Sequence, residues 1–293
     1  MAATGSTSGS HASEVASGQR FEFGRNWLRF LALLDEPRIE TAERSLREML
    51  EVENLEGRRF LDLGCGSGLS SLAARRLGAV VHSFDYDPQS VICTRELRRR
   101  FFPDDPDWTV EEGSVLDASY LARLGCYDVV YSWGVLHHTG AMWDALGKVA
   151  PLVTAGGKLF IAIYNDQGNR SQRWRAVKRT YNWLPRGLRF LVLVPAMTSL
   201  RWRGIVKDLV LLRPFPSLRG YGNNRGMSLW RDTIDWVGGY PFEVAKPEEI
   251  FEFYRARGFV LSQLRTCRGD IGCNEFVFIR REGEGAERDG LRR

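Results

Sequence analysis

The sequence predicts an α/β fold in which helices cover both faces of a mostly parallel sheet. Two observations support this prediction. Residues 60–68 form a short apolar run that passes through three glycines into a helical pattern, as expected of a buried strand that turns sharply into a helix. Apolar runs and helical patterns then alternate as far as Tyr164, which is the order that parallel strands with crossover helices produce.

Regular alternation stops after Tyr164 and resumes at Pro247, where Glu248 and Glu249 occupy a first helical turn and Gly258 ends the pattern. Apolar residues at helical spacing also predict helices within residues 21–34 and 39–50, ahead of the first strand. The expected strands are 58–63, 79–84, 108–111, 127–132, 157–164 (entered through a turn at 156–157), 259–266 and 274–281, and the expected helices of the core are 68–77, 90–101, 141–152 and 247–257.

These elements divide the chain into a core and added segments. Residues 1–19 are rich in Ser, Gly, Ala and Thr, lack the apolar centre of a signal peptide, and are expected to be a disordered tail. The early helices form either a lid over a ligand or simple packing on the sheet edge. The expected parts are therefore a helical lid over 20–57, a core over 58–164 and 247–281, a basic helical insertion over 165–246, and a second disordered tail over 282–293.

Composition excludes several classes of protein. Apolar residues make up 44% and charged residues 26% of the 293, which is ordinary for a globular protein. The five cysteines form no Cys-x-x-Cys pair, so neither a disulfide framework nor a zinc site is expected, and we expect no metal and a cytoplasmic location.

The positive charge is concentrated in one segment. Residues 165–236 carry fourteen Arg or Lys against four Asp, or +10, so the rest of the chain carries +5 − 10 = −5. This segment also holds many aromatic residues, and three interpretations stay open. It forms a substrate cap, lies on an anionic membrane surface, or binds single-stranded nucleic acid.

The glycine-rich turn predicts a ligand-binding loop. Glycine lets the backbone approach a ligand closely and adopts positive φ without a steric penalty, and the helix that follows presents free N–H groups. The dinucleotide fingerprint requires a glycine where this chain has Leu69, so a nicotinamide cofactor is not the first expectation.

Residues 60–68 resemble motif I of the class I S-adenosylmethionine (SAM)-dependent methyltransferases. The acidic residue Asp85 after the second apolar run, and residues 127–138, which resemble motif IV, follow in the family's order. The resemblance implies a Rossmann-like, seven-stranded, mostly parallel sheet with an antiparallel last strand, and SAM as cofactor. It assigns the cofactor site to Asp62, Gly64, Cys65, Gly66, Gly68, Asp85, Tyr86, Ser114, Val115, Trp133 and Gly134.

Two positions in this set, Asp85 and Ser114, and the nearby Asp117 carry alternatives. Asp85 is placed to accept hydrogen bonds from ribose hydroxyls, although a helix-capping role is open because Asp87-Pro88 follows. Ser114 stands where the family often has an aspartate, which puts a strong adenine-amine contact in doubt. Asp117 either makes that contact or caps the next helix.

Two adjacent histidines, His137 and His138, follow the fourth strand, close to where the resemblance places the transferred methyl group. An imidazole titrates near neutrality and is able to deprotonate a hydroxyl or amine during attack. The alternative is that both side chains satisfy backbone carbonyls in a loop.

Polar and aromatic residues beyond the fifth strand are expected to contact the acceptor. Tyr164, Asn165 and Gln167 follow that strand, and Tyr240 lies in a Gly-Gly turn flanked by aromatics. The alternative for the first three is a solvated turn. The resemblance favours methyl transfer to oxygen or nitrogen, less readily to carbon, of a small and lipophilic acceptor, as in ubiquinone-biosynthesis methyltransferases. RNA methylation and an inactive membrane-associated or pathway-associated protein are the alternatives, although no RNA-recognition signature is present.

Overall fold

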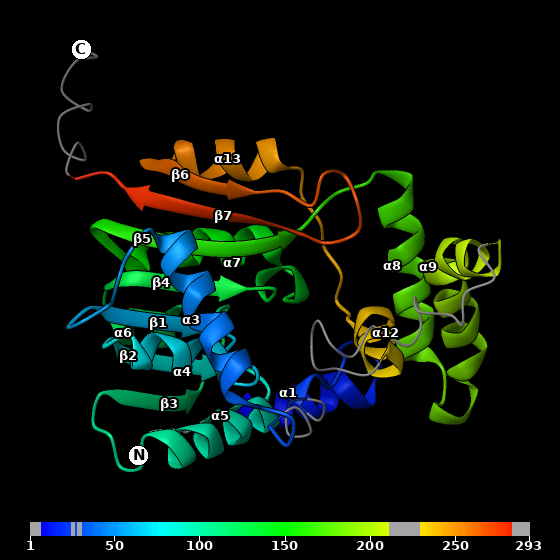
Figure 1. Cartoon of the computed structure of the whole chain (residues 1–293), viewed down its shortest axis with the longest axis horizontal. Helices are drawn as coiled ribbons and strands as arrows, with labels where there is room; N and C mark the ends of the chain where they lie inside the picture. The colour runs from blue at the N-terminus through cyan, green and yellow to red at the C-terminus, as the bar shows by residue number, and fades with distance from the viewer. Residues whose placement is uncertain (1–6, 25–26, 28–30, 211–228, 283–293) are drawn as a thin grey trace.

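A single seven-stranded sheet organises the molecule in the computed structural model, which describes residues 7–24, 27, 31–210 and 229–282. The strand order is β3-β2-β1-β4-β5-β7-β6, and only β7 runs antiparallel to its neighbours β5 and β6. This confirms the predicted fold class. Figure 1 shows helices on both faces of the sheet and a separate group of helices beyond the ends of the strands.

The helices and strands follow one another with short connections in the core. In chain order the structure has α1 (Thr7–Ala16), α3 (Glu36–Leu50), β1 (Arg59–Leu63), α4 (Leu69–Arg76), β2 (Val80–Asp85), α5 (Pro88–Phe101), β3 (Trp108–Glu112), α6 (Ala118–Leu124), β4 (Tyr127–Trp133), η1 (Leu136–His138), α7 (Met142–Val149), η2 (Ala150–Leu152), β5 (Val153–Tyr164), α8 (Asn169–Trp183), η3 (Arg186–Leu188), α9 (Phe190–Val210), α12 (Leu229–Gly238), α13 (Pro247–Arg255), β6 (Phe259–Arg265) and β7 (Cys273–Arg280).

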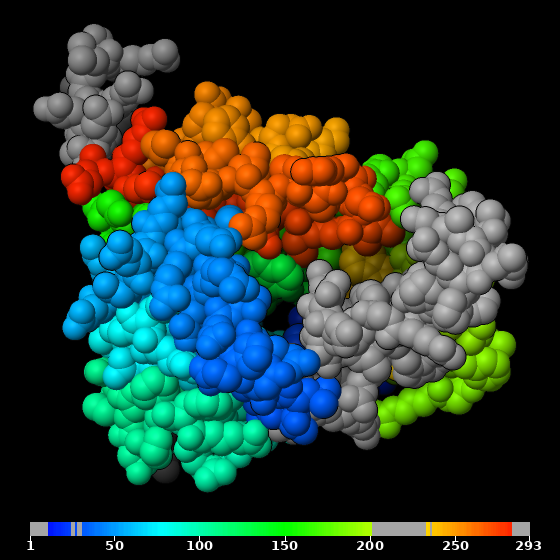
Figure 2. Space-filling model, in the orientation of Figure 1, coloured from blue at the N-terminus to red at the C-terminus, as the bar shows by residue number. Residues whose placement is uncertain are grey.

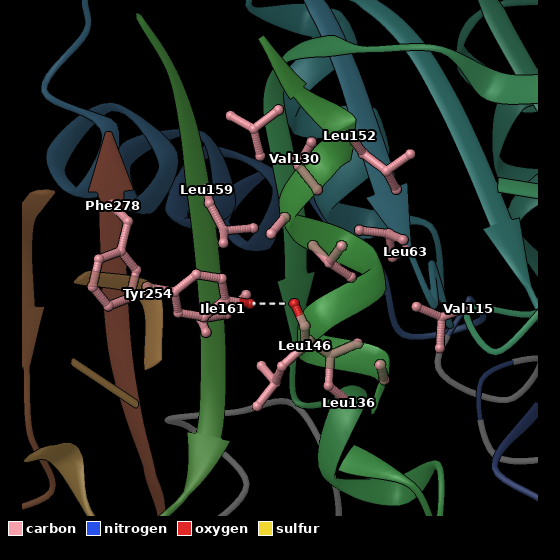
Figure 3. Close-up of a cluster of buried hydrophobic side chains, with 14 of the residues drawn as sticks. Leu63, Val115, Val130, Leu136, Leu146, Leu152, Leu159, Ile161, Tyr254 and Phe278 are labelled. Carbon is pink, nitrogen blue, oxygen red and sulfur yellow. Dashed lines mark hydrogen bonds between the residues drawn. The ribbon is translucent and has the colours of Figure 1, made fainter. Parts of the chain in front are cut away.

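The core lies in two layers, one on each face of the sheet. Helices α6, α7 and α13 cover one face, and α3, α4 and α5 cover the other. Figure 3 shows Leu146 and Tyr254 against Leu159 of β5 and Phe278 of β7, with the Tyr254 hydroxyl donating to the Leu146 carbonyl at 3.2 Å. Each fully buried side chain of this size contributes about 1.5–3 kcal/mol, so the sheet is a rigid base for the loops at its ends.

Two details of the core differ from the sequence-based expectation. The strand expected from residue 157 begins at Val153, because Gly156, at φ +72°, lies within a register shift between β4 and β5 rather than in a turn before the strand. Helix α6 was not predicted. Asp117 begins it by accepting hydrogen bonds from the amides of Ser119 and Tyr120, which settles the role of Asp117 as a helix cap.

The N-terminal segment is a correction to the sequence-based prediction. Residues 7–16 form helix α1 instead of a disordered tail. The Glu14 carboxylate accepts a hydrogen bond from the Tyr86 hydroxyl at 3.0 Å and pairs with Arg20 at 2.6 Å. Contacts with distant residues therefore order a segment whose own composition favours disorder. Residues 1–6 and 283–293, both expected to be disordered, lie outside the described residues.

The lid expected over 20–57 is only partly present. Helix α3 packs on α4 and β5 and buries Ile39, Leu46 and Leu50 in the core, so it takes the packing alternative. Phe21, Phe23 and Trp27 line the cavity described below. The helix expected within 21–34 falls partly on undescribed residues.

The insertion after β5 has a small core of its own. Trp174 and Tyr181 of α8, Leu193 of α9 and Val237 of α12 pack together with Phe21 from the N-terminal segment. Figure 1 shows α8, α9 and α12 to one side of the sheet, and in Figure 2 α13, β6 and β7 form the upper part of the molecule while α3 crosses the middle. The insertion and the N-terminal segment therefore support each other.

Candidate functional site

A cavity of about 1400 Å³ lies at the carboxyl ends of the parallel strands. In open α/β sheets this is the place where ligands bind, next to the point at which strand order reverses. The reversal here is between β1 and β4. The cavity is lined by the loops after β1, β2, β3 and β4, by the N-terminal segment, by the insertion and by the loop before β7. It is larger than the usual 300–1,000 Å³ of a single-ligand pocket.

The loop after β1 requires its glycines. Gly64, Gly66 and Gly68 have φ of +78°, +54° and +79°, in the left-handed region that other residues enter only with strain. A Cβ on Gly64 would lie 2.4 Å from the Val135 side chain. Gly64 and Gly66 line the cavity, whereas Gly68 does not. A Cβ on Gly68 would instead meet Thr94 at 2.9 Å, so that glycine allows α4 to approach α5.

Asp85 lies at the end of β2 and lines the cavity. One carboxylate oxygen accepts the Gly66 amide at 2.9 Å, and the other accepts the Asp87 amide at 2.9 Å. Burial raises the pKa of Asp85 to about 6. Asp87, rather than Asp85, begins α5 by accepting the Gln89 amide. Each Asp85 oxygen therefore keeps a lone pair for a further donor.

The other residues predicted around the glycine loop have different tasks. Asp62 is buried and accepts a hydrogen bond from the Ser71 hydroxyl at 2.5 Å, and burial raises its pKa to about 7. The buried Cys65 thiol accepts a bond from Thr94 at 3.2 Å, and burial raises its pKa well above the usual range. Both residues line the cavity, but their polar groups mainly hold β1, α4 and α5 together.

The loops after β2, β3 and β4 complete this wall. Tyr86, Ser114, Val115, Trp133 and Gly134 all line the cavity. The Ser114 hydroxyl accepts the Leu116 amide at 3.2 Å, so it shapes its own turn. The Trp133 indole donates to Glu275 at 3.0 Å, which links this loop to β7.

The two histidines occupy different positions. His137 is fully buried and does not line the cavity, and its Nδ1 accepts the Tyr164 amide at 3.3 Å. This placement corrects the expectation that His137 meets the acceptor. His138 does line the cavity, and its Nδ1 lies 2.6 Å from the carbonyl oxygen of Pro241. Because a carbonyl only accepts, Nδ1 carries the proton and Nε2 of the neutral ring keeps its lone pair.

Both rings are neutral at physiological pH. Burial lowers the pKa of His138 to about 3, and the nearby Lys178 and Arg20 act in the same direction. Burial lowers the pKa of His137 well below its usual value, with His138 and Lys178 adding to the effect. His138 therefore offers Nε2 as a hydrogen-bond acceptor and not as a charged donor.

Of the four residues predicted to contact the acceptor, one lines the cavity and three do not. Tyr164 lines the cavity, with its ring 3.9 Å from the ring of His137 between centroids. Asn165 accepts a bond from Asn274, and Gln167 donates to the Gly269 carbonyl. Tyr240 accepts the Phe21 amide at its own carbonyl. The last three do not line the cavity, so they connect the insertion, the last hairpin and the N-terminal segment instead of meeting a ligand.

A buried lysine lies behind the acceptor end of the cavity. The Lys178 ammonium donates to the Trp236 carbonyl and lies 4.2 Å from the Trp236 ring and 4.8 Å from the Phe242 ring. No carboxylate within the described ranges is paired with it, and burial lowers its pKa to about 7. Aromatic faces stabilise such an ammonium group.

Several lining residues were not predicted from the sequence. Glu14, Arg20, Phe21, Phe23 and Trp27 come from the N-terminal segment. Arg20 donates to the His138 carbonyl at 3.0 Å and lies over the Tyr86 ring, 4.9 Å from its centroid. The aromatic spacing at Phe23 and Trp27 was the only available signal, because nothing local links Glu14 or Arg20 to the cavity.

The remaining unpredicted part of the lining comes from the insertion and from the loop before β7. It consists of Arg170, Ser199, Leu200, Thr233, Trp236, Asp270, Ile271, Gly272 and Cys273. These residues surround the end of the cavity where Tyr164 lies.

The described part of the chain contains no cluster of His, Cys, Asp or Glu suited to a metal ion. No helix within the described ranges is long and apolar enough to cross a membrane.

The core of the chain is similar to known methyltransferases. A family model described as a methyltransferase domain matches residues 61–159. The chain is 35% identical over 121 residues to a tRNA U34 carboxymethyltransferase of Alcanivorax borkumensis, covering 40% of this chain and 36% of the relative. It is 33% identical over 144 residues to a ubiquinone biosynthesis O-methyltransferase of Parvibaculum lavamentivorans, covering 46% of this chain and 52% of the relative.

A solved structure extends the similarity in fold beyond the core. An O-methyltransferase family protein from Burkholderia thailandensis superposes with a TM-score of 0.52 at 16% identity, covering 89% of this chain and 59% of that one. At this identity the likeness concerns the fold alone. The chain spans between about a third and a half of the length of the two curated relatives above, and the family model ends before α8.

Proposed function

Since this chain belongs to the class I SAM-dependent methyltransferases, we propose that it transfers a methyl group from SAM to an oxygen or nitrogen of a small, largely apolar acceptor. One observation carries the proposal. A single cavity has the glycine loop and Asp85 on one wall and the neutral His138 among aromatic rings on another. Donor and acceptor sites in one enclosure are what a direct transfer requires.

The residues present fit the cofactor. Asp85 retains lone pairs on both oxygens that suit the two hydroxyls of a ribose. Gly64 and Gly66 line the cavity with backbone atoms that carry no side chain. Tyr86 and Val115 add an aromatic and an apolar surface to the same wall, which suits an adenine. When bound there, SAM supplies a methyl group already activated by a positive sulfonium.

The chain's own contribution at the acceptor end is positioning. His138 Nε2, left unprotonated because Nδ1 donates to Pro241, accepts a hydrogen bond from an acceptor O–H or N–H and orients the attacking atom. The proton that the acceptor loses passes to solvent, because burial, Lys178 and Arg20 disfavour a charged His138. Phe23, Tyr164 and Trp236 line the same region with aromatic rings. These surfaces favour a flat or apolar acceptor.

The N-terminal segment encloses the site. Arg20 bonds the carbonyls of His138 and Thr139, and Glu14 bonds Tyr86. Exclusion of water strengthens polar interactions inside a cavity and protects an electrophile from hydrolysis.

Calorimetry with SAM and with S-adenosylhomocysteine tests the cofactor part of the proposal. We expect saturable binding that Asp85→Asn weakens at least tenfold, because one charged acceptor is lost. Asp117→Asn is the matched control, since that carboxylate caps α6 outside the cavity. Absence of binding heat in the unmodified protein would overturn the proposal.

Acceptor class is tested by transfer of a radiolabelled methyl group. Phenols, quinols, amines and total tRNA are offered in parallel to the unmodified protein. Labelling of a phenol, quinol or amine supports the proposal, and cofactor binding without labelling of any of these would contradict it.

Methylation of tRNA is the second candidate, favoured by the name of the relative from Alcanivorax borkumensis and by the basic charge of residues 165–236. Arginine and lysine on the surface bind phosphates and make affinity fall steeply with salt. Labelling of tRNA alone, at a rate that decreases between 50 and 200 mM salt, would favour this candidate over a small acceptor.

A further inference from the structure

The turn between α8 and α9 exposes a concentrated group of large apolar side chains. We call Trp183, Leu188, Phe190, Leu191 and Val194 the α8–α9 tip. Trp183 is 77% exposed, and Phe190 and Leu191 are 55% and 56% exposed. Single exposed apolar residues are ordinary on protein surfaces, but a contiguous group marks an interaction site.

The tip has a defined geometry. Phe190, Leu191 and Val194 share one face of α9 because they are three and four positions apart, while Leu193 and Ala196 turn into the small core of the insertion. Arg189 donates to the carbonyls of Leu184 and Asn182 and fixes the turn. In Figure 1 this turn lies at the end of the molecule away from the sheet, and in Figure 2 the yellow-green first half of α9 is at its outer edge.

Positive charge surrounds the tip. Arg179 lies four residues before Trp183 on the same exposed face of α8, and Arg186 is exposed in the turn itself. The sequence contains no Asp or Glu between Asn169 and Lys207. The tip therefore combines apolar side chains that protrude with arginines whose own helices carry no acidic residue before Asp208. Glu22 of the N-terminal segment lines the same hollow as Arg186, whereas Arg179 does not line that hollow.

We propose that the α8–α9 tip docks on the surface of a bilayer that contains anionic phospholipids. Tryptophan and other large apolar side chains enter the boundary between headgroups and acyl chains, and arginines beside them contact lipid phosphates. Each arginine near an anionic surface adds to the attraction, which salt weakens. The proposal does not depend on the methyl acceptor.

A second copy of the chain suits this surface poorly. A two-fold contact applies the same patch on both sides, so it would bring the arginines around the tip of one copy close to those of the other. Like charges facing each other across an interface are unfavourable. An anionic lipid surface supplies the opposite charge to these arginines.

Docking would also bring the cavity close to the bilayer. Ser199 and Leu200 line the cavity from α9, and Val194 is five residues before Ser199 in the same helix. That separation is about 8 Å along the helix axis. A lipophilic molecule that leaves the bilayer beside the tip would have a short path to the acceptor end.

Co-sedimentation of the full chain with vesicles tests the proposal. Vesicles of phosphatidylcholine alone are compared with vesicles of phosphatidylcholine and phosphatidylglycerol at a 3:1 ratio. We expect binding to the second kind at low salt, with at least tenfold weaker binding at 0.5 M salt. Failure of the unmodified protein to sediment with anionic vesicles at low salt would overturn the proposal, as would equal binding to both kinds.

Matched variants locate the surface. We expect Trp183→Ser/Leu191→Ser to weaken vesicle binding at least tenfold and Arg179→Gln/Arg186→Gln to weaken it severalfold. The control Val260→Ser/Leu264→Ser removes two apolar residues of β6 that are 45% and 46% exposed, and we expect unchanged binding. Thermal melting and SAM calorimetry check that each variant is folded. Equal loss in the control and tip variants would also overturn the assignment.

Discussion

The two ends of the cavity are built in different ways. The cofactor end consists of the short loops that follow β1, β2, β3 and β4. Its glycine loop is held to Asp85, whose carboxylate accepts the amides of Gly66 and Asp87. The acceptor end combines the N-terminal segment, the insertion and the loop before β7, which meet only in the folded chain. The cofactor end therefore depends on backbone shape, and the acceptor end depends on side chains from distant segments.

The largest effect is expected from a change of backbone shape at the cofactor end. Gly64→Ala places a Cβ 2.4 Å from Val135 at a φ of +78°. The left-handed conformation alone costs about 1–2 kcal/mol, and the overlap displaces the loop, so we expect loss of SAM binding and a lower melting temperature. Calorimetry and thermal melting measure both.

Gly125→Ala is the control for this change. Gly125 has a φ of +73°, but a Cβ there would meet nothing within 4 Å, and the residue does not line the cavity. We expect normal SAM affinity even though stability falls, because a φ of +73° with a ψ of −151° is a conformation essentially restricted to glycine. Equal loss of SAM binding in the two variants would show that SAM binding does not depend specifically on the backbone shape of the glycine loop.

A side-chain change at the acceptor end is expected to have the next largest effect. In His138→Asn the amide nitrogen takes the place of Nδ1 and still donates to Pro241, but Nε2 is gone. Because the acceptor is then no longer oriented, we expect turnover to fall about 10²-fold with unchanged SAM affinity, as measured by single-turnover methyl transfer and calorimetry. His82→Asn is the control, because His82 pairs with Glu111 away from the cavity. Unchanged turnover in His138→Asn would remove His138 from the mechanism.

The pH dependence of cofactor binding is expected to follow the titration of one group at the cofactor end, Asp85. Burial raises the pKa of Asp85 to about 6, so its carboxylate gains a proton as the pH falls through 6 and loses its capacity to accept ribose hydroxyls. We expect SAM affinity to be constant above pH 7 and to weaken by up to about tenfold per pH unit below 6. Calorimetry from pH 5 to 8 measures this. Asp85→Asn should show weak, pH-independent binding, and the same slope in that variant would assign the titration to another group.

The smallest effect is expected from the buried lysine behind the acceptor end. Burial lowers the pKa of Lys178 to about 7 from 10.5, so between these values the unfolded chain binds more protons and stability rises with pH. The slope from one group is at most about 1.4 kcal/mol per pH unit. We expect Lys178→Met to remove this rise and to change stability near pH 7 by about 1–2 kcal/mol, because apolar replacement of a buried charge is often tolerated. Urea unfolding at pH 7 and 9 provides the test.

In the N-terminal segment, composition predicts disorder but the structure shows a helix. Residues 7–16 contain few apolar side chains, and a disordered tail was the reasonable prediction. Their order comes from Glu14, which bonds Tyr86 at a separation of 72 residues, and from Arg20, which reaches the His138 carbonyl at a separation of 118. Pairings at such separations leave no periodic signal in the sequence.

The sequence by itself determined the α/β core, the glycine loop and the acidic end of β2. These features are local, because three glycines, a strand of apolar residues and the next acidic residue specify them within about 25 positions. Only the tertiary structure decided which of two adjacent histidines lines the cavity, since the Pro241 carbonyl that orients His138 is 103 residues away. It likewise decided that Asn165, Gln167 and Tyr240 connect segments and that α1 closes the site, because these outcomes depend on packing between elements remote in the chain.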